Sequence, residues 1–429
     1  MARLKLVMVG NGMAGVRTLE ELLKVAPDLY EITVFGAEPH PNYNRILLSP
    51  VLAGEQTLDE IILNPLQWYA DHGITLHLNR KVVDVDRRRR VVVADDGTEA
   101  AYDRLLIATG SSPFILPVPG KELTGVMAYR DIADTNRMIE TARTHRHAVV
   151  IGGGLLGLEA ANGLMLRGMT VTVVHIAPWL MERQLDQKAS QLLQRSLEDR
   201  GMRFRIGAHT ETLLGGEDGR VKAVRFKDGT EVEADLVVMA AGIRPNTELA
   251  RHIGLRCDHD GRGGISVTDT MQTLTDPRIY AVGECASHRG VAYGLVAPLF
   301  EQGKVCATHL AQFGIGQYKG SQTSTKLKVT GIDLFSAGDF MGGEGTEEIV
   351  LTDPHGGVYR KLVLRGDKLV GACLYGDTTD GSWYFKLIRE GTPIAGLRGQ
   401  LMFGEPAEPV GAQAASASAS PTHAEALAA

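Results

Sequence analysis

Short apolar runs alternate with polar stretches of helical length along the first part of the chain, twice in the same order. In the first series a strand, a helix and a strand are expected at 4–9, 16–25 and 31–35. In the second series the same elements are expected at 148–151, 158–167 and 170–175. Strands that alternate with helices are typical of parallel sheets covered by helices. The pattern therefore predicts two α/β units of one design.

Each series carries a glycine turn directly after its first strand. The two turns read Gly10-Asn11-Gly12-Met13-Ala14-Gly15 and Gly152-Gly153-Gly154-Leu155-Leu156-Gly157. The first glycine permits a tight turn, the second lets the backbone approach a pyrophosphate, and the third lets the helix pack closely on the strand. In a chain with 50 glycines one match can be a plain turn. Two matches in the same context predict two dinucleotide sites.

The ends of later strands supply further candidate ligand contacts. Glu38 lies roughly 20 residues beyond Gly15, the spacing at which an acidic side chain accepts hydrogen bonds from a ribose. Its alternative role is that of a solvated loop glutamate, because Gly36 and Ala37 displace it from the strand. Two apolar runs end in small residues, which let the backbone approach a ligand. The first run ends in Ala108, Thr109 and Gly110, and the second ends in Ala240, Ala241 and Gly242.

The rest of the chain divides by pattern. Further strands of the second unit are expected around 203–207, 221–226 and 232–240, and a buried strand at 278–282 is closed by Gly283 and Glu284. Residues 316–405 alternate short apolar strands with glycine turns and end in an amphipathic helix near 382–389, which predicts a third, mixed α and β domain. Residues 406–429 are almost entirely Ala, Ser, Pro and Glu, and we expect disorder there.

Charge and cysteine usage exclude several classes of protein. The formal net charge is −6, so nothing favours nucleic acid, and the basic run 87–90 is interpreted as a solvated turn between strands at 81–85 and 91–94. Apolar runs are too short to span a bilayer, which predicts a soluble, cytoplasmic protein. The four cysteines lie far apart, which leaves iron–sulfur ligands and a vicinal dithiol unsupported and favours reduced, buried thiols, although a long-range pair stays open.

Taken in order, these motifs resemble the FAD-dependent pyridine nucleotide-disulfide oxidoreductase superfamily. Within it, the segments 43–49, 180–186, 293–298 and 324–328 are most similar to the flavin portion of assimilatory NAD(P)H nitrite reductase large subunits. The resemblance covers about 4–404. It implies two Rossmann-like, three-layer, glutathione-reductase-like domains plus a C-terminal α+β domain. The implied division is an FAD-binding domain at 1–115 and 244–315, an NAD(P)H-binding domain at 116–243, and an interface domain at 316–405.

The resemblance also implies a set of FAD contacts. Gly10, Gly12 and Gly15 would hold the FAD pyrophosphate, with Met13 and Ala14 in the same turn. Glu38 would bind the adenosine ribose, and Glu284, where the family usually has Asp, would accept from the ribityl chain. A helix that starts near the flavin pyrimidine ring would stabilise negative charge there. The remaining implied contacts are Arg45, Ser49, Ala108, Thr109, Gly110, Gly283, Ala297 and Pro298.

For the coenzyme, Gly152, Gly154 and Gly157 would hold the pyrophosphate, together with Leu155, Leu156 and Gly242. Glu159, placed on the first turn of its helix, is the one catalytic candidate, near the nicotinamide and flavin N5; its alternative role is to balance the helix dipole. Many relatives pair this glutamate with a lysine after a Leu-Ser motif, but here Pro50 follows Ser49, which puts that ion pair in doubt. His175, at the strand end, is a further expected coenzyme contact, but it selects neither NADH nor NADPH. NADH is favoured because no arginine cluster follows before Arg183.

These features together predict an NAD(P)H oxidoreductase that passes electrons through FAD to a separate metal-centred partner. The expected role is the electron-transfer subunit of an assimilatory nitrate or nitrite reductase. Rubredoxin or ferredoxin reduction is the alternative enzyme function, and an FAD- and NADH-binding redox sensor is the alternative of another class. Thiol-dependent relatives are disfavoured because no cysteine precedes Cys257. No metal site, nucleic-acid partner or membrane partner is expected, and a homodimer stays possible.

Overall fold

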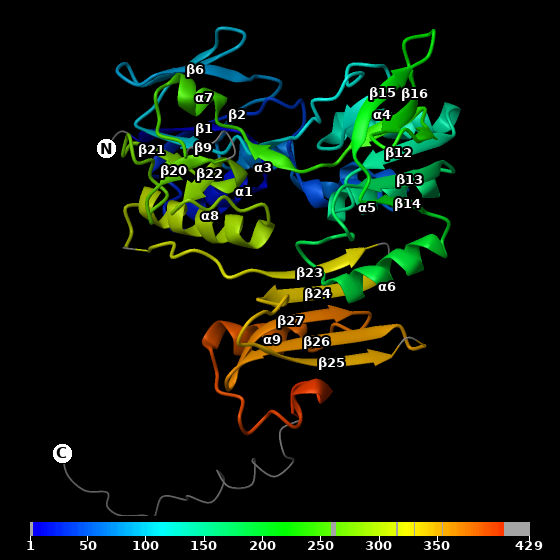
Figure 1. The fold of residues 1–429 in the computed structure, drawn as a ribbon. Coiled ribbons are helices and arrows are strands. Elements are labelled where there is room, and N and C mark those ends of the chain that lie inside the picture. Colours follow the sequence, from blue (N-terminus) through cyan, green and yellow to red (C-terminus); the bar gives the residue numbers. More distant parts are fainter. Residues whose placement is uncertain (1–2, 259–262, 315, 330, 354, 407–429) are drawn as a thin grey trace, which may run out of the picture. The chain divides into compact units, whose positions relative to one another are not determined.

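The computed structural model describes residues 3–258, 263–314, 316–329, 331–353 and 355–406 (Figure 1). Its contacts divide the chain into two compact units. Of the described residues, those within 1–183, 190–323 and 329–331 form the first unit, and those within 184–189, 324–328 and 332–406 form the second.

The first unit contains two five-stranded parallel sheets that repeat one strand order. The first sheet has the order β21-β9-β1-β2-β5, from Ile279–Ala281, Arg104–Ile107, Leu4–Val9, Tyr30–Phe35 and Thr75–His77. The second has the order β11-β18-β12-β13-β14, from Val126–Ala128, Leu236–Met239, His147–Ile151, Thr170–His175 and Arg203–Ile206. This repetition confirms the two α/β units predicted from the pattern.

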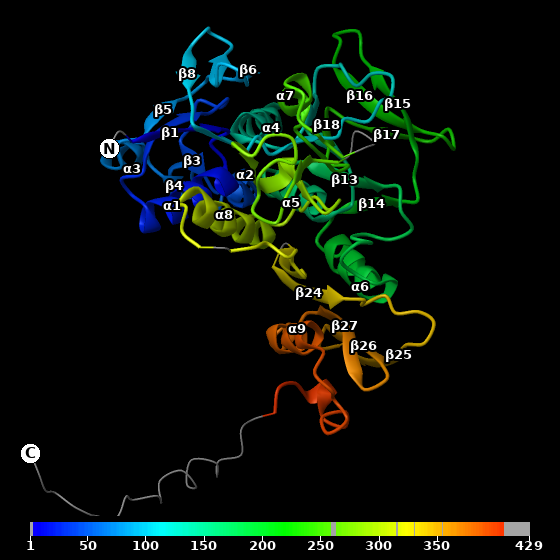
Figure 2. The same cartoon turned by 90° about the vertical axis from the view of Figure 1, so that its left-hand side faces the viewer.

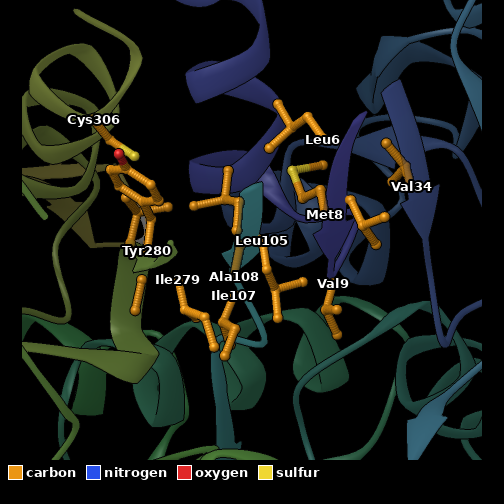
Figure 3. Packing of buried hydrophobic residues seen from close by; sticks show 14 of the residues in the cluster. Leu6, Met8, Val9, Val34, Leu105, Ile107, Ala108, Ile279, Tyr280 and Cys306 are labelled. Carbon is orange, nitrogen blue, oxygen red and sulfur yellow. The ribbon is translucent and has the colours of Figure 1, made fainter. Parts of the chain in front are cut away.

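Central strands of these sheets are apolar because helices and small antiparallel sheets pack against them and bury both of their faces. Leu6 and Met8 of β1 and Leu105 and Ile107 of β9 are almost fully buried. Figure 3 shows them side by side, with Tyr280 of β21 next in the row. Strand β21 therefore completes the first sheet with residues that lie far along the chain from the other four strands.

Helices α1 (Met13–Val25) and α5 (Leu155–Leu166) each follow a glycine turn. Helix α8 (Val296–Leu310) packs against α1 (Figure 2). The two halves of the unit meet where α2 (Leu48–Ala53) packs on α5, at a point where a side chain on Gly163 would press on Leu52. The other helices are α3 (Leu66–Asp71), α4 (Ile132–Thr144), α6 (Gln187–Glu198) and α7 (Glu248–His252).

Small sheets complete the first unit. The basic run 87–90 is the turn between β6 (Val82–Asp86) and β7 (Val91–Ala94), as expected. The backbone N–H groups of Arg88 and Arg89 donate to Asp86 and hold this turn.

The prediction of a single strand at 232–240 is wrong, because this segment divides into β17 (Glu231–Glu233) and β18, which are separated by Ala234 and Asp235. The small sheets join β6-β7-β8 (Val82–Asp86, Val91–Ala94, Glu99–Ala101), β15-β16-β17 (Thr210–Gly215, Val221–Phe226, Glu231–Glu233), β10-β19 (Ser111–Pro113, Ile243–Pro245), β20-β22 (Ile265–Val267, Ala286–His288) and β3-β4 (Asn42–Tyr43, Ile62–Asn64).

The second unit is a five-stranded sheet with one long helix, which confirms the predicted α+β class of this part of the chain. Its strand order is β23-β24-β27-β26-β25, from Ser324–Val329, Ile332–Gly338, Lys368–Tyr375, Val358–Arg365 and Glu347–Asp353. Helix α9 (Gly381–Glu390) packs on β24 and β27 through Tyr384 and Leu387 (Figure 1).

The two compact units differ from the three predicted domains in two ways. Both predicted nucleotide-binding domains lie in the first unit, and the segment Gln184–Ala189, expected in the coenzyme domain, belongs to the second unit. Asp186 explains this difference, since it accepts a hydrogen bond from the Tyr359 hydroxyl at 2.6 Å. From residue 407 on, the tail expected at 406–429 lies outside the described residues. Within the described parts of the chain, no helix is both long and apolar enough to cross a bilayer.

Candidate functional site

A cleft of about 660 Å³ opens at the carboxyl end of the first parallel sheet. Its walls include the first glycine turn, the loop after β2 and the turn after β9. Leu155, Leu156 and Glu159, from the start of α5 in the other half, line the same cleft. The volume is in the range of small-molecule sites, and the position at the carboxyl ends of parallel strands is where such folds bind ligands.

Each of the three glycines of the first turn is needed for a different physical reason. Gly10 has φ +103°, and a Cβ there would overlap the Ala108 carbonyl oxygen. A Cβ on Gly15 would lie 2.9 Å from Met8 and Ala108 atoms, so this glycine lets α1 pack on the sheet. Gly12 lines the cleft, and a Cβ there would meet no atom within 4 Å. Gly12 thus keeps open the space that a pyrophosphate would fill.

The donors beside this open space fit an anionic group. The backbone N–H groups at the start of α1 point into the turn, where a helix N-terminus favours negative charge. Asn11, in the same turn, also lines the cleft, and its Nδ2 is buried without a hydrogen-bond partner. The turn therefore fits the FAD pyrophosphate that the sequence implies.

Glu38 lines the cleft within a cluster of three side chains. Arg45 lies 2.6 Å from one of its carboxylate oxygens, and the Tyr43 hydroxyl donates to the other at 2.7 Å. Burial alone would raise the pKa of Glu38, but the charge and hydrogen bond of Arg45, helped by Tyr43, hold it below the ordinary value. Glu38 is therefore an oriented carboxylate and not a loosely solvated one, as ribose binding requires.

Glu284 also lines the cleft, three residues after the end of β21. Its Oε2 atom accepts from the Ser111 hydroxyl at 2.8 Å and pairs with the Arg130 guanidinium. Arg45 also donates to the Arg130 carbonyl oxygen at 2.7 Å, which links this cluster to the one around Glu38. The longer glutamate that replaces the expected aspartate is thus held by partners on two other elements.

The second glycine turn repeats the geometry of the first. Gly152 has φ +128°, and a Cβ there would overlap the Ala240 carbonyl oxygen, while a Cβ on Gly157 would overlap the Gly152 carbonyl oxygen. A Cβ on Gly154 would meet nothing within 4 Å. This turn therefore offers the same open space at its middle glycine and fits the pyrophosphate of a second dinucleotide.

Glu159 lies where the two halves meet. Helix α5 begins at Leu155 and has no acidic residue in its first turn, so the expected first-turn position is wrong and the helix-dipole role loses its geometric basis. The Ser49 hydroxyl donates to Glu159 Oε2 at 2.7 Å, and the Tyr129 hydroxyl lies 3.4 Å from Ser49 Oγ. Burial raises the pKa of Glu159, against the lowering effect of the Ser49 hydrogen bond. The hydrogen-bond partner of Glu159 is therefore the hydroxyl of Ser49, the residue before Pro50.

His175 is buried, and both of its ring nitrogens have protein partners. Nδ1 accepts from the Gly153 backbone N–H at 3.0 Å, and Nε2 lies 3.1 Å from Glu182 Oε2. A hydrogen bond from this ring to a coenzyme would have to compete with one of these interactions. The predicted binding role of His175 stays a prediction.

The cleft brings together most of the residues predicted from the sequence. Those that line it are Gly10, Gly12, Met13, Ala14, Glu38, Arg45, Ala108, Thr109, Gly110, Leu155, Leu156, Glu159, Gly283 and Glu284. The predicted residues that do not line it are Gly15, Ser49, Gly152, Gly154, Gly157, His175, Gly242, Ala297 and Pro298. Near the start of α8, Val296, Leu299 and Phe300 line the cleft in place of Ala297 and Pro298.

Several polar residues of the cleft were not predicted from the sequence. They are Asn11, Tyr43, Ser111, Tyr129, Arg130 and Asn246. Asn11 lies in the first glycine turn and Tyr43 lies two residues before Arg45, so their positions in the sequence carry a signal for a site role. Arg130 has no such signal, because only the folded chain brings it to Glu284.

Comparison with known proteins agrees with this geometry. Residues 4–312 match the family described as pyridine nucleotide-disulphide oxidoreductase, and residues 324–392 match the rubredoxin NAD+ reductase C-terminal domain. The chain is 53% identical over 395 residues to the NAD(P)H nitrite reductase of Bacillus subtilis (strain 168), covering 92% of this chain and 48% of that protein. It is 48% identical over 380 residues to the assimilatory nitrate reductase electron transfer subunit of the same organism, covering 89% of this chain and 48% of that protein.

The chain thus spans about half the length of these curated relatives. Among solved structures, it is similar to the covalent putidaredoxin reductase–putidaredoxin complex, with a TM-score of 0.82 and 28% identity over 92% of this chain and 94% of that chain. The family match covers both glycine turns and the cleft between them. The chain therefore belongs to the pyridine nucleotide-disulphide oxidoreductases, as a flavoprotein oxidoreductase whose cofactors are FAD and NAD(P)H.

Proposed function

We propose that this chain passes electrons from NAD(P)H through FAD to a separate metal-centred protein, as the electron-transfer subunit of an assimilatory nitrate or nitrite reductase. One observation carries the proposal. Leu155 and Leu156 of the second glycine turn, together with Glu159 just after it, line the cleft that the first glycine turn opens. A coenzyme on the second turn can therefore present its nicotinamide to a flavin held by the first.

The residues of the cleft bind and orient, and the cofactor supplies the chemistry. FAD, held by these residues, would supply a two-electron acceptor for the hydride of NAD(P)H and a one-electron donor for the next protein. Glu38 and Glu284 would fix its ribose and ribityl ends, and the start of α8 would stabilise negative charge on its pyrimidine ring. Hydride transfer needs alignment and exclusion of water more than a nucleophile or an acid–base pair.

Cysteine chemistry has no place in this route. All four cysteines are free, and none lines the cleft. Cys285, which directly follows Glu284, is buried, and burial raises its pKa and keeps it a thiol. Electrons that reach the flavin would therefore leave the chain for a partner.

The nature of the acceptor follows from the relatives. Two of them, at 53% and 48% identity, carry nitrite and nitrate reductase names, and one is named an electron transfer subunit. Nitrite reduction to ammonia consumes six electrons at a metal centre. Among the residues described here, no group of three or more His, Cys, Asp or Glu side chains is placed to hold a metal ion. We assign the metal centre to a separate partner because one of these relatives is named an electron transfer subunit. The cytoplasmic location stays a prediction.

A rubredoxin or ferredoxin reductase is the second candidate, and the match of 324–392 to a rubredoxin reductase C-terminal domain favours it. Both candidates share the reductive half-reaction and differ only in the acceptor. Supplying purified acceptors one at a time separates them.

The decisive experiment is anaerobic stopped-flow reduction of the FAD-loaded chain by NADH and NADPH, followed by mixing with a nitrate or nitrite reductase metal subunit, a rubredoxin or a ferredoxin. Rapid flavin bleaching and reoxidation by the nitrate or nitrite reductase subunit are expected. Reoxidation by rubredoxin alone would overturn the proposed acceptor. Slow bleaching with a persistent charge-transfer band would overturn the enzyme function and favour a redox sensor.

A further inference from the structure

The end of β13 carries an arrangement that the flavin chemistry does not use. His175, the last residue of the strand, is buried, and its Nδ1 accepts a hydrogen bond from the Gly153 N–H at 3.0 Å. Because a backbone N–H can only donate, the ring proton of a neutral His175 is on Nε2. That nitrogen lies 3.1 Å from Glu182 Oε2 and therefore donates to it.

A backbone hydrogen bond of the preceding residue, Met181, fixes the loop that carries Glu182. The Met181 N–H donates to the Gly153 carbonyl oxygen at 3.0 Å, so both backbone groups of Gly153 are used to anchor this corner. Met181 is fully buried and has φ +52°, a left-handed conformation that is uncommon outside glycine. The segment from Leu180 to Glu182 is thus folded back onto the second glycine turn, and an acid from a loop is brought to the end of a strand.

The end of the second strand has a defined role in a dinucleotide-binding unit. Strand β13 is the second strand of its unit and runs parallel to β12, which feeds the glycine turn. The side chain at the end of such a strand meets the adenosine ribose of the coenzyme, and an acid there accepts from the ribose hydroxyls. In this chain the strand itself ends in His175, whose one ring donor is already directed at Glu182.

We propose that Glu182 is the residue that selects NADH over NADPH, by accepting from the adenosine ribose hydroxyls and repelling a 2′-phosphate, and that His175 is its positioning residue. The proposal rests on the coenzyme part of the proposed function and is independent of the electron acceptor. A phosphate monoester carries between one and two negative charges at neutral pH, so it would be disfavoured beside a carboxylate.

Arg183 is the obvious competitor, because an arginine accommodates a 2′-phosphate. Its side chain is exposed, whereas Glu182 is partly buried and receives a hydrogen bond from a buried ring. The carboxylate is therefore the group whose position the fold determines, and it should dominate selection.

The test measures binding without turnover, on the FAD-loaded full chain. ADP-ribose and 2′-phospho-ADP-ribose carry the adenosine end of NADH and NADPH without the nicotinamide, and calorimetry gives a Kd for each. The wild type should prefer ADP-ribose. E182Q, which keeps the shape and removes the charge, should reduce that preference about tenfold. The neighbouring R183Q variant is the matched control and should leave the preference unchanged.

His175 is tested by the same ratio of the two Kd values, which general destabilisation would not change. H175A should reduce the preference in the wild type but have no further effect in E182Q, because it acts through Glu182. An unchanged ratio in E182Q, or a larger change in R183Q than in E182Q, would overturn the proposal. Binding of neither probe by the wild type would instead overturn the coenzyme site itself.

Discussion

The Ser49 hydroxyl donates a hydrogen bond of 2.7 Å to Glu159, so a residue of the flavin half directly holds the carboxyl group of the coenzyme half. Ser49 lies on α2 and Glu159 on α5, two helices that pack on each other. Burial raises the pKa of Glu159, and the Ser49 hydrogen bond opposes that effect. The pair therefore influences the pKa of an acid that lies where nicotinamide and flavin are expected to meet.

Replacing Ser49 by alanine should raise the pKa of Glu159 further, because the interaction that lowers it is lost. We expect the inflection in the pH dependence of flavin reduction by NADH to move to higher pH, with a change of several fold in the rate near neutrality. S49T, which keeps a hydroxyl, is the control. Stopped-flow measurements between pH 5 and pH 9 check this, and an inflection unchanged in S49A would contradict it.

Replacing Glu159 by glutamine should change how stability depends on pH. The raised pKa means that the folded chain holds this proton more tightly than the unfolded chain, whose carboxyl titrates near 4.5. The stabilisation is complete below that value and is lost as pH rises through the folded-state pKa. E159Q should therefore gain stability relative to the wild type as pH rises above 4.5. Urea unfolding of the FAD-loaded protein at several pH values measures the difference, and parallel curves would contradict it.

Glycines of the first turn should respond differently to an added methyl group. At Gly12 the methyl group occupies open space in the cleft, so G12A should fold normally and bind FAD at least about tenfold more weakly. At Gly10 the methyl group overlaps the Ala108 carbonyl oxygen, so G10A should lose about 2 kcal/mol or more of folding stability. Thermal unfolding and flavin titration separate the two effects. A stable G10A or a G12A with normal FAD affinity would be contrary to this account.

Glu38 should make the protein sensitive to acid. Its pKa is lowered by Arg45 and Tyr43 against the effect of burial, so its contribution is present above the ordinary value of 4.5 and is lost as pH falls through the lowered pKa. Because the pair with Arg45 is partly exposed, about 1 kcal/mol is expected. Wild type should lose this increment below pH 4.5 and E38Q should not. Unfolding measured from pH 7 to pH 3 tests it, and equal acid sensitivity would refute it.

Arg360 should be essential to the second unit. Its buried guanidinium lies 3.0 Å from Asp380 and donates to the Tyr384 hydroxyl and the Met402 carbonyl oxygen, each at 2.9 Å. R360M leaves these acceptors without their cation and should cost about 3 kcal/mol. Limited proteolysis and unfolding of the full chain, with the flavin spectrum as a check on the first unit, measure the effect.

The matched control for Arg360 is Arg365 on the same strand. Arg365 pairs with Asp339, and both of these side chains are exposed. R365M should cost less than about 1 kcal/mol. Similar losses in R360M and R365M would argue against the buried network as the source of stability.

The sequence alone was sufficient for the two Rossmann-like units and for the residues of both glycine turns. Each strand, turn and helix there is contiguous, so apolar period and glycine chemistry report it locally. The turn at 87–90 and helix α9 were predictable for the same reason.

Tertiary structure decided what joins distant parts of the chain. Examples are the Ser49–Glu159 hydrogen bond, the pairing of Arg130 with Glu284, and the insertion of β21 beside β9. It also moved the segment Gln184–Ala189 into the second unit and brought Glu182 back to His175. The physical reason is that hydrogen bonds and burial between residues far apart in sequence leave no periodic pattern, because they depend on how whole elements pack.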